Sequence, residues 1–204
     1  MKWVIEHSVF LNTMICALML MVWIVYLQLL LNGYRRQRRS SILITRGAGT
    51  GLRARCLITN MSAEPIYVTS LVAAIITNEG RTDIQLTDLR DLPEDLGIDP
   101  RSAMRQGSLE TSRYIDLGHF DDLISQMADK TADELAETYG AFDFELTVLA
   151  LYGSEEMPVG SKRVFSIDKS RTGQWRVTPT TITTKQLRTN RERRALLKKI
   201  ADLL

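Results

Sequence analysis

The chain has 204 residues, of which 45% are hydrophobic and 25% are charged, and its formal net charge is +2. This length suits one domain with a real core and a short additional segment. The two cysteines, Cys16 and Cys56, belong to no Cys-x-x-Cys pair and no Cys/His cluster, which argues against a disulfide framework or a zinc site. We expect no metal, no cofactor and no nucleic-acid partner.

The small net charge conceals a strong separation of charge along the chain. Residues 79–145 contain 17 acidic and 6 basic residues, a net charge of −11, so the remaining residues carry +13. Such separation indicates either an acidic face turned away from anionic lipid or ordinary solvated acidic loops.

The first element is an apolar segment, Ser8–Tyr34, which contains no Asp, Glu, Lys or Arg. A transmembrane helix needs roughly 20 apolar residues, whereas the apolar part of a signal peptide has only about 7–15. No Ala-x-Ala-like cleavage site follows the segment. The pattern therefore predicts that residues 1–34 form a transmembrane anchor that is retained in the protein.

A basic juxtamembrane segment, residues 35–40, follows the anchor. Four of its residues are arginines: Arg35, Arg36, Arg38 and Arg39. Lys and Arg beside a transmembrane helix stay preferentially on the cytoplasmic side. We therefore predict that the N-terminus lies outside, that residues 35–204 are cytoplasmic, and that the four arginines contact anionic lipid.

Alternating apolar and polar residues in the region 41–184 predict an antiparallel β-domain. An immunoglobulin-like sandwich is the first choice of fold, and a small barrel is the alternative. The predicted strands are Ile42–Thr45, Arg53–Thr59, Ile66–Thr77, Phe144–Tyr152, Lys162–Asp168 and Gln174–Thr178. The fifth of these is the natural hairpin partner of the fourth.

The middle of the domain, residues 81–140, is less regular and is predicted to be a helical and loop insertion. Asp91–Pro100 is acidic and contains two prolines, which is typical of a loop. A short strand is expected at Tyr114–Gly118, a helix at His119–Met127, and one or two further helical turns at Asp133–Tyr139.

The last segment, residues 185–204, is predicted to be a basic amphipathic helix. Thr189 and Glu192 have the spacing of a capping box, which marks its start. Its apolar stripe consists of Leu196, Leu197, Ile200 and Leu203, with Leu204 at its end. This stripe must be buried against the helix's own domain, the membrane surface or a partner, and the sequence leaves these alternatives open.

Two further patterns are compared with known chemistry. Gly47–Gly51 contains three glycines, as phosphate-binding loops do, but a strand pattern rather than a helix follows it, which favours a flexible strand connection. His119 beside Asp121 and Asp122 lacks a nucleophile motif, so we interpret it as a structural or surface histidine. The sequence predicts no enzyme.

One arrangement resembles a known family. Arg35-x-x-x-Arg39 is followed 21 positions later by Asn60-x-Ser62, and this resembles the motif of the PilZ domain, a small β-barrel that binds cyclic di-GMP. The resemblance implies that Arg35 and Arg39 grip the ligand and that Asn60 and Ser62 hydrogen-bond to it. Pro65 stands where the family's motif has its final Gly.

Together these features predict a single-span, membrane-anchored binding or scaffold module, an accessory subunit of a membrane protein assembly. Its expected partners are the lipid bilayer and another membrane protein or a second copy of the chain. The alternative is a PilZ-like cyclic-dinucleotide receptor at the membrane.

Overall fold

A computed structural model of the protein describes residues 7–37, 39–87, 104–128, 132–153, 155–170 and 173–203. The chain forms two compact units, Met1–Arg39 and Ser40–Leu204. The predicted loop Asp91–Pro100 lies outside the described residues.

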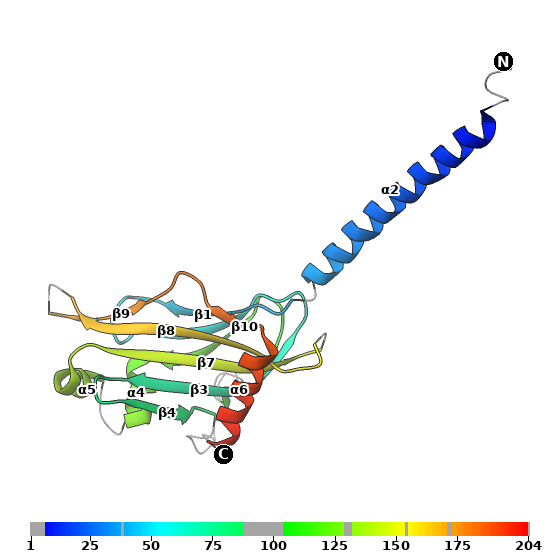
Figure 1. The fold of residues 1–204 in the computed structure, drawn as a ribbon. Coiled ribbons are helices and arrows are strands. Elements are labelled where there is room, and N and C mark those ends of the chain that lie inside the picture. Colours follow the sequence, from blue (N-terminus) through cyan, green and yellow to red (C-terminus); the bar gives the residue numbers. More distant parts are fainter. Residues whose placement is uncertain are drawn as a thin grey trace. The chain divides into compact units, whose positions relative to one another are not determined.

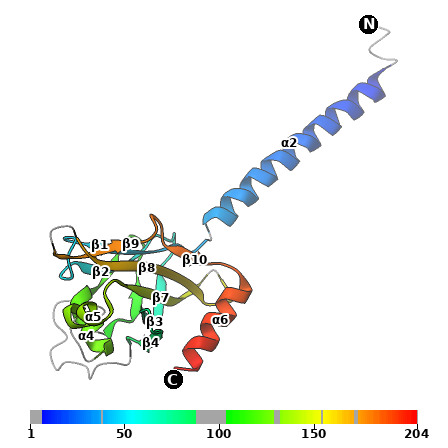
Figure 2. The ribbon, with the colours of Figure 1, turned by 60° about the vertical axis from the view of Figure 1, so that its left-hand side comes forward.

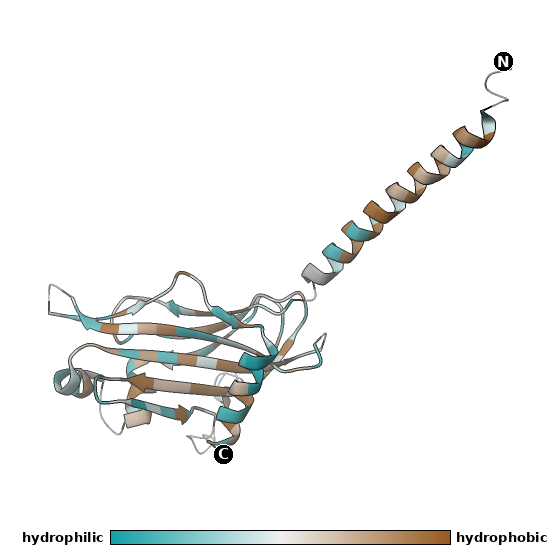
Figure 3. Ribbon diagram, viewed as in Figure 1, coloured by the Kyte–Doolittle hydropathy of each residue, from teal (hydrophilic) through white to brown (hydrophobic). Residues whose placement is uncertain are grey.

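The first unit contains one long helix, α2 (Ser8–Gln37). Apolar residues occupy most of its surface, as Figure 3 shows. Its apolar stretch, Ser8–Tyr34, has 27 residues and is long and apolar enough to cross a membrane.

The second unit is built on a seven-stranded antiparallel sheet, here called the larger sheet (Figure 1). In spatial order its path is β10 (Lys185–Leu187), β8 (Val159–Lys169), β7 (Phe142–Tyr152), β3 (Ile66–Ile76) and β4 (Arg81–Gln85). Two short strands complete it: β5 (Gly107–Leu109) pairs with β3, and β9 (Trp175–Pro179) pairs with β8. The predicted hairpin is confirmed, because β7 and β8 pair antiparallel with Phe144 opposite Phe165.

A smaller sheet of three strands shares the main apolar core with the larger one. Its order is β1 (Ile42–Gly47), β2 (Arg55–Asn60) and β6 (Tyr114–His119). The described strands thus form two antiparallel sheets and no closed barrel, which confirms a mainly β, sandwich-like fold.

The main core lies between the two sheets and the helix α4 (Phe120–Ala128). The ring of Phe120 packs edge-on against Phe144 and Phe165, with centroids 5.6 and 4.9 Å away. Alternate residues of β7 and β8 face this core because side chains alternate across a strand. The thiol of Cys56 is buried in the same core, and burial raises its pKa well above the usual range.

A second apolar cluster lies on the opposite, outer face of the larger sheet, under α6 (Asn190–Ala201). Its buried members are Val72, Leu149, Leu187, Leu196 and Ile200. The second unit therefore has three layers, and Figures 1 and 2 show α6 in red on the outer one.

Residues 81–140 are more than a helical and loop insertion. Their strands β4 and β5 pair with β3, and β6 is the third strand of the smaller sheet. The predicted strand at Tyr114–Gly118 and helix at His119–Met127 are both present, and α5 (Ala132–Tyr139) follows. The alternation of apolar and polar residues does not reveal short polar strands such as β4, because they contain too few apolar residues.

The outer edge of β1 is closed by side chains instead of a strand. The amide of Gln186 donates to the carbonyl of Ile42 (2.6 Å) and accepts from its N–H (3.1 Å), as a neighbouring peptide unit would. Thr184 Oγ1 accepts from the N–H of Ile44 (2.9 Å). We call this contact between β1 and the chain around β10 the seam.

A buried arginine, Arg163 on β8, completes the seam. Its guanidinium donates to the carbonyls of Ile44, Thr181 (2.8 Å) and Ile182 (3.0 Å). Burial lowers the pKa of Arg163, and these carbonyl oxygens provide the polar contacts that a buried guanidinium requires.

Replacement of Gln186 by alanine is expected to lower the free energy of unfolding by about 1–3 kcal/mol, because it leaves the two main-chain groups of Ile42 without their partner. Chemical denaturation measures this change. Gln174→Ala, which truncates an exposed glutamine, is the matched control and is expected to have an effect within about 0.5 kcal/mol. Equal stability of both variants would show that the seam does not stabilise the fold.

Candidate functional site

The C-terminal helix is docked on its own domain. Thr189 is the N-cap, and its hydroxyl accepts from the N–H of Glu192 while the Glu192 carboxylate accepts from the N–H of Thr189, so the predicted capping box is confirmed. Leu196 and Ile200 are buried in the outer apolar cluster, and Leu197 and Leu203 pack partly buried against it. The apolar stripe is therefore used within the fold.

Close approach of α6 to the sheet depends on Gly160 of β8. A Cβ atom at this position would lie 2.8 Å from Leu196 Cδ2 and 3.1 Å from Leu187 Cδ1. Leu196 therefore occupies space that any other residue at position 160 would take.

A buried arginine also fastens the start of α6. Arg193 Nε donates to the carbonyl of Leu187 (3.1 Å), and its Nη1 pairs with the Glu155 carboxylate. Ser40, at the beginning of the folded unit, donates its hydroxyl to the same carboxylate (3.1 Å). Glu155 thus links the first residue of the domain to its last helix.

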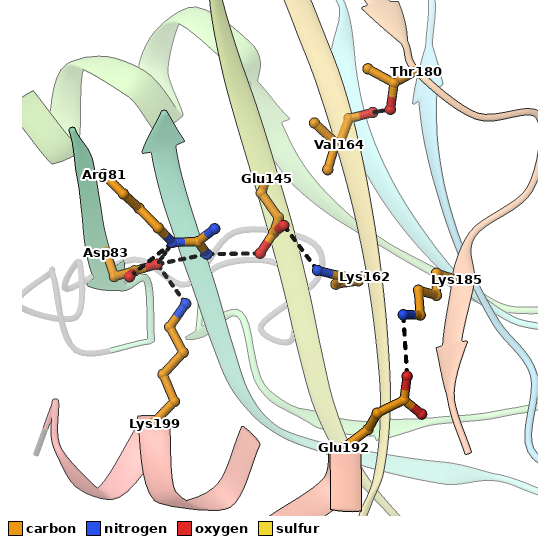
Figure 4. A network of polar contacts seen from close by, with 9 residues as sticks. All are labelled: Arg81, Asp83, Glu145, Lys162, Val164, Thr180, Lys185, Glu192 and Lys199. Atoms are coloured by element: carbon orange, nitrogen blue, oxygen red, sulfur yellow. Dashed lines mark hydrogen bonds and ion pairs between the residues drawn. The ribbon is translucent and has the colours of Figure 1, made fainter. Parts of the chain in front are cut away.

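Beside this docked helix lies a groove lined by charged and apolar side chains, and it is the candidate functional site. The groove has a volume of about 280 Å³ and lies between α6 and the outer face of the larger sheet. Its charged lining residues are Arg81, Glu145, Lys162, Lys185, Glu192 and Lys199. Figure 4 shows them on strands β4, β7, β8 and β10 and on α6, with Lys185 and Glu192 paired apart from the connected network of the others.

Ion pairs connect these side chains across the elements. The Glu145 carboxylate forms ion pairs with Arg81 Nη2 at 2.8 Å and with Lys162 Nζ at 3.2 Å. Asp83, at the edge of the groove, receives Arg81 Nε at 3.0 Å and Lys199 Nζ at 2.6 Å. The lysine on α6 is thereby tied to strand β4.

The carboxylates in this network stay ionised. Burial favours a higher pKa for Glu145, but the hydrogen bond and charge of Arg81 and the charge of Lys162 outweigh it, and the pKa is lowered. Asp83 behaves alike, because hydrogen bonds from Arg81 and Lys199 overcome its burial and lower its pKa. The hydrogen bond to Asp83 in turn raises the pKa of Arg81.

Comparison of the chain with known protein families, curated proteins and solved structures finds no match.

Asn60 and Ser62 of the PilZ-like motif do not line this groove and have structural contacts. Asn60 is fully buried, and its Nδ2 donates to the carbonyls of Glu64 (3.0 Å) and Leu109 (2.9 Å). Its Oδ1 accepts from the N–H of Ser62 (2.8 Å), and Ser62 Oγ accepts from the N–H of Ser41 (2.9 Å). A ligand would have to displace these hydrogen bonds.

The arginines of the motif lie in the first unit, at and after the C-terminal end of α2. Arg35 and Arg36 lie in α2, Arg39 follows it and is exposed, and Arg38 lies outside the described residues. Their lipid contacts and the cyclic-dinucleotide alternative stay predictions. Titration of the protein with cyclic di-GMP is the direct test of the second.

The remaining candidates from the sequence have structural roles. The ring of His119 hydrogen-bonds with the carbonyl of Arg53 at the end of β6. Gly47–Gly51 connects β1 to β2, as expected, and the Thr50 carbonyl accepts from the N–H of Val177 (2.8 Å). Within the described residues, no group of three or more His, Cys, Asp or Glu side chains is placed to hold a metal ion.

Sequence reasoning missed the groove. Part of the groove could have been predicted from the sequence. Glu145 lies between the core-facing Phe144 and Leu146, and this alternation indicates a charged residue on the outer face of β7. The β7–β8 register places Lys162 opposite Thr147, two residue pairs from Glu145. The partners Arg81 and Lys199 are distant in the chain, and only the fold brings them together.

Asn60→Ala is expected to lower the free energy of unfolding by about 3 kcal/mol, because three main-chain groups lose their hydrogen-bonding partner, two of them in buried hydrogen bonds. Asn78→Ala, in the exposed turn after β3, is the control and is expected to change stability by less than about 0.5 kcal/mol. Denaturant titration compares them. A fully stable Asn60→Ala protein would show that this side chain is available for another role.

Acid is expected to weaken the contribution of Glu192 to stability. Hydrogen bonds from Thr189, and then from Lys185, lower the pKa of Glu192 from 4.5 to about 2 in the folded protein. A lowered pKa stabilises the fold fully above the unfolded value, and this stabilisation disappears as the pH falls through the folded value. The wild-type protein is therefore expected to have a higher Tm than Glu192→Gln at pH 6, with the difference vanishing between pH 4.5 and about 2.

Thermal unfolding of both proteins over this pH range measures the difference in Tm. Titration of Asp83 and Glu145 cancels in this difference, because both proteins contain these groups. Glu137→Gln, at an exposed position of α5, is the control, and its difference from wild type is expected to be small at every pH. A difference between wild type and Glu192→Gln that does not change with pH would refute the charged capping box.

Proposed function

We propose that the chain is a single-span, membrane-anchored binding and scaffold module, an accessory subunit of a membrane protein assembly. The observation that carries the proposal is α2, whose apolar stretch Ser8–Tyr34 has a mean hydropathy of 2.5 in its most apolar part and is not buried inside the protein. So many exposed apolar side chains are unfavourable in water and stable in hydrocarbon. At about 1.5 Å per residue, the stretch is longer than a bilayer core of roughly 30 Å.

The charges beside the helix support one orientation. Arg35, Arg36, Arg38 and Arg39 follow the apolar stretch, whereas Lys2 is accompanied by Glu6 on the other side. By the preference of basic residues for the cytoplasmic side, the folded unit faces the cytoplasm.

In this proposal the anchor acts by raising local concentration. A module held at the membrane meets other proteins of the same membrane at a high effective concentration, so weak contacts suffice for assembly. Because α6 buries its apolar stripe on its own domain, the partner is engaged by the remaining polar surface of the folded unit. The role is one of binding, with no catalytic step.

The test is crosslinking in native membranes, followed by purification of the full chain and mass spectrometry. We expect one membrane protein to be recovered in a fixed ratio to the chain. The control replaces residues 8–34 by an unrelated apolar helix of the same length, which keeps the anchor and the domain. A partner retained by this control binds the folded unit, and one lost from it binds α2.

If neither the wild-type chain nor the control with the replaced helix recovers a partner, the accessory-subunit role is overturned. Release of the chain from membranes by alkaline carbonate would overturn the transmembrane anchor. Protease added to sealed, right-side-out vesicles tests the orientation, since a cytoplasmic domain is expected to be protected until detergent is added.

A further inference from the structure

Four cationic side chains and two carboxylates line the groove beside α6. The Lys185 side chain is 60% exposed, and those of Lys162 and Lys199 are 35% and 32% exposed. Of the two carboxylates, Glu192 is 33% exposed and Glu145 is 8% exposed. Three ammonium groups are therefore accessible, and the lining residues carry more positive than negative charge.

Three ammonium groups in the groove retain hydrogen-bonding capacity. Each has three N–H donors. Among the described residues, Lys162 contacts Glu145, Lys199 contacts Asp83 at 2.6 Å, and Lys185 contacts Glu192 at 3.1 Å. Each lysine therefore keeps two donors for a further acceptor.

The three lysines are also well separated in the chain and held by different elements. Lys162 lies on β8, Lys185 on β10 and Lys199 on α6, and all three line the groove. Figure 4 shows each ammonium group directed to the carboxylate of its own ion pair. Their carboxylate partners restrict the side chains before any ligand arrives, which lowers the entropy cost of binding.

Size and charge together select the kind of ligand. The volume of the groove, about 280 Å³, is slightly smaller than the roughly 300–1,000 Å³ that is typical of sites for drug-sized molecules. A single carboxylate carries only one negative charge against the three ammonium groups. A phosphate or pyrophosphate group has several charged oxygens in a small volume, and lysine is a common point-charge ligand of phosphate.

We propose that this groove binds a small phosphate-bearing anion through Lys162, Lys185 and Lys199. The inference rests on the proposed function only in treating the folded unit as a binding module, and it requires no protein partner. The phosphate belongs either to a soluble compound or to a lipid headgroup, since the chemistry of recognition is the same.

The test is titration of inorganic pyrophosphate into the full chain in nanodiscs of zwitterionic lipid, followed by calorimetry. We expect saturable binding of one pyrophosphate per chain. Lys185→Gln is the decisive variant because its side chain is the most exposed, and it is expected to weaken binding by roughly tenfold or more. Lys162→Gln is expected to weaken binding to a similar extent.

Lys198→Gln is the matched control. Lys198 precedes Lys199 on the same helix, is exposed and does not line the groove, so this variant is expected to bind within about twofold of wild type. The Tm of each variant is measured alongside, and affinities are compared only between proteins that unfold at similar temperatures.

Nanodiscs of different composition distinguish the two sources of phosphate. If phosphatidic acid in the disc weakens pyrophosphate binding and an equal charge of cholesteryl hemisuccinate does not, the natural ligand is a lipid headgroup. If neither lipid weakens it, the ligand is soluble. Absence of saturable binding, or equal affinity of Lys185→Gln and Lys198→Gln, overturns the proposal.

Failure here is separable from failure of the proposed function. A flat titration with a partner still recovered by crosslinking removes the anion site alone. Pyrophosphate binding without any crosslinked partner removes the accessory-subunit role and keeps the groove.

Discussion

The folded unit depends on how the open edge of β1 is closed. An unpaired strand edge presents N–H and carbonyl groups that invite pairing with other chains. Here the amide of Gln186 pairs with Ile42 in place of a neighbouring strand, and Thr184 and Arg163 pair with the main chain of Ile44, two residues along. The same stretch continues as β10, buries Leu187 and reaches the N-cap of α6 two residues later. Closure of the smaller sheet and docking of the last helix are therefore parts of one arrangement.

Whether a feature could be predicted from the sequence depends on how far apart in the chain its residues are. The apolar helix, the hairpin of β7 with β8 and the capping box of Thr189 are local patterns, and each was predicted. The seam joins Gln186 to Ile42 across 144 positions of the chain, and side-chain periodicity contains no record of such a pair. The groove is similar, because its cations come from four elements whose neighbours are set only by strand order.

Asn60 shows why a short polar motif has two physical readings. Its side-chain oxygen accepts from the N–H two residues on, which is the geometry of an Asx turn. The Asn-x-Ser spacing that resembles a ligand-binding motif is thus also the spacing that turns require. Burial separates these readings, and burial depends on β5 and Leu109, whose carbonyl receives the other end of the amide.

The state of the two cysteines bears on how this protein is studied. Cys56 is enclosed in the core with a raised thiol pKa, which suppresses the thiolate that reacts with alkylating reagents, and Cys16 lies within the apolar stretch of α2. The folded unit is accordingly a quiet background for site-directed labelling, whereas the exposed Cys16 of α2 has to be replaced first. In that background, a single cysteine placed on the outer face would carry a spin label or fluorophore at one known position.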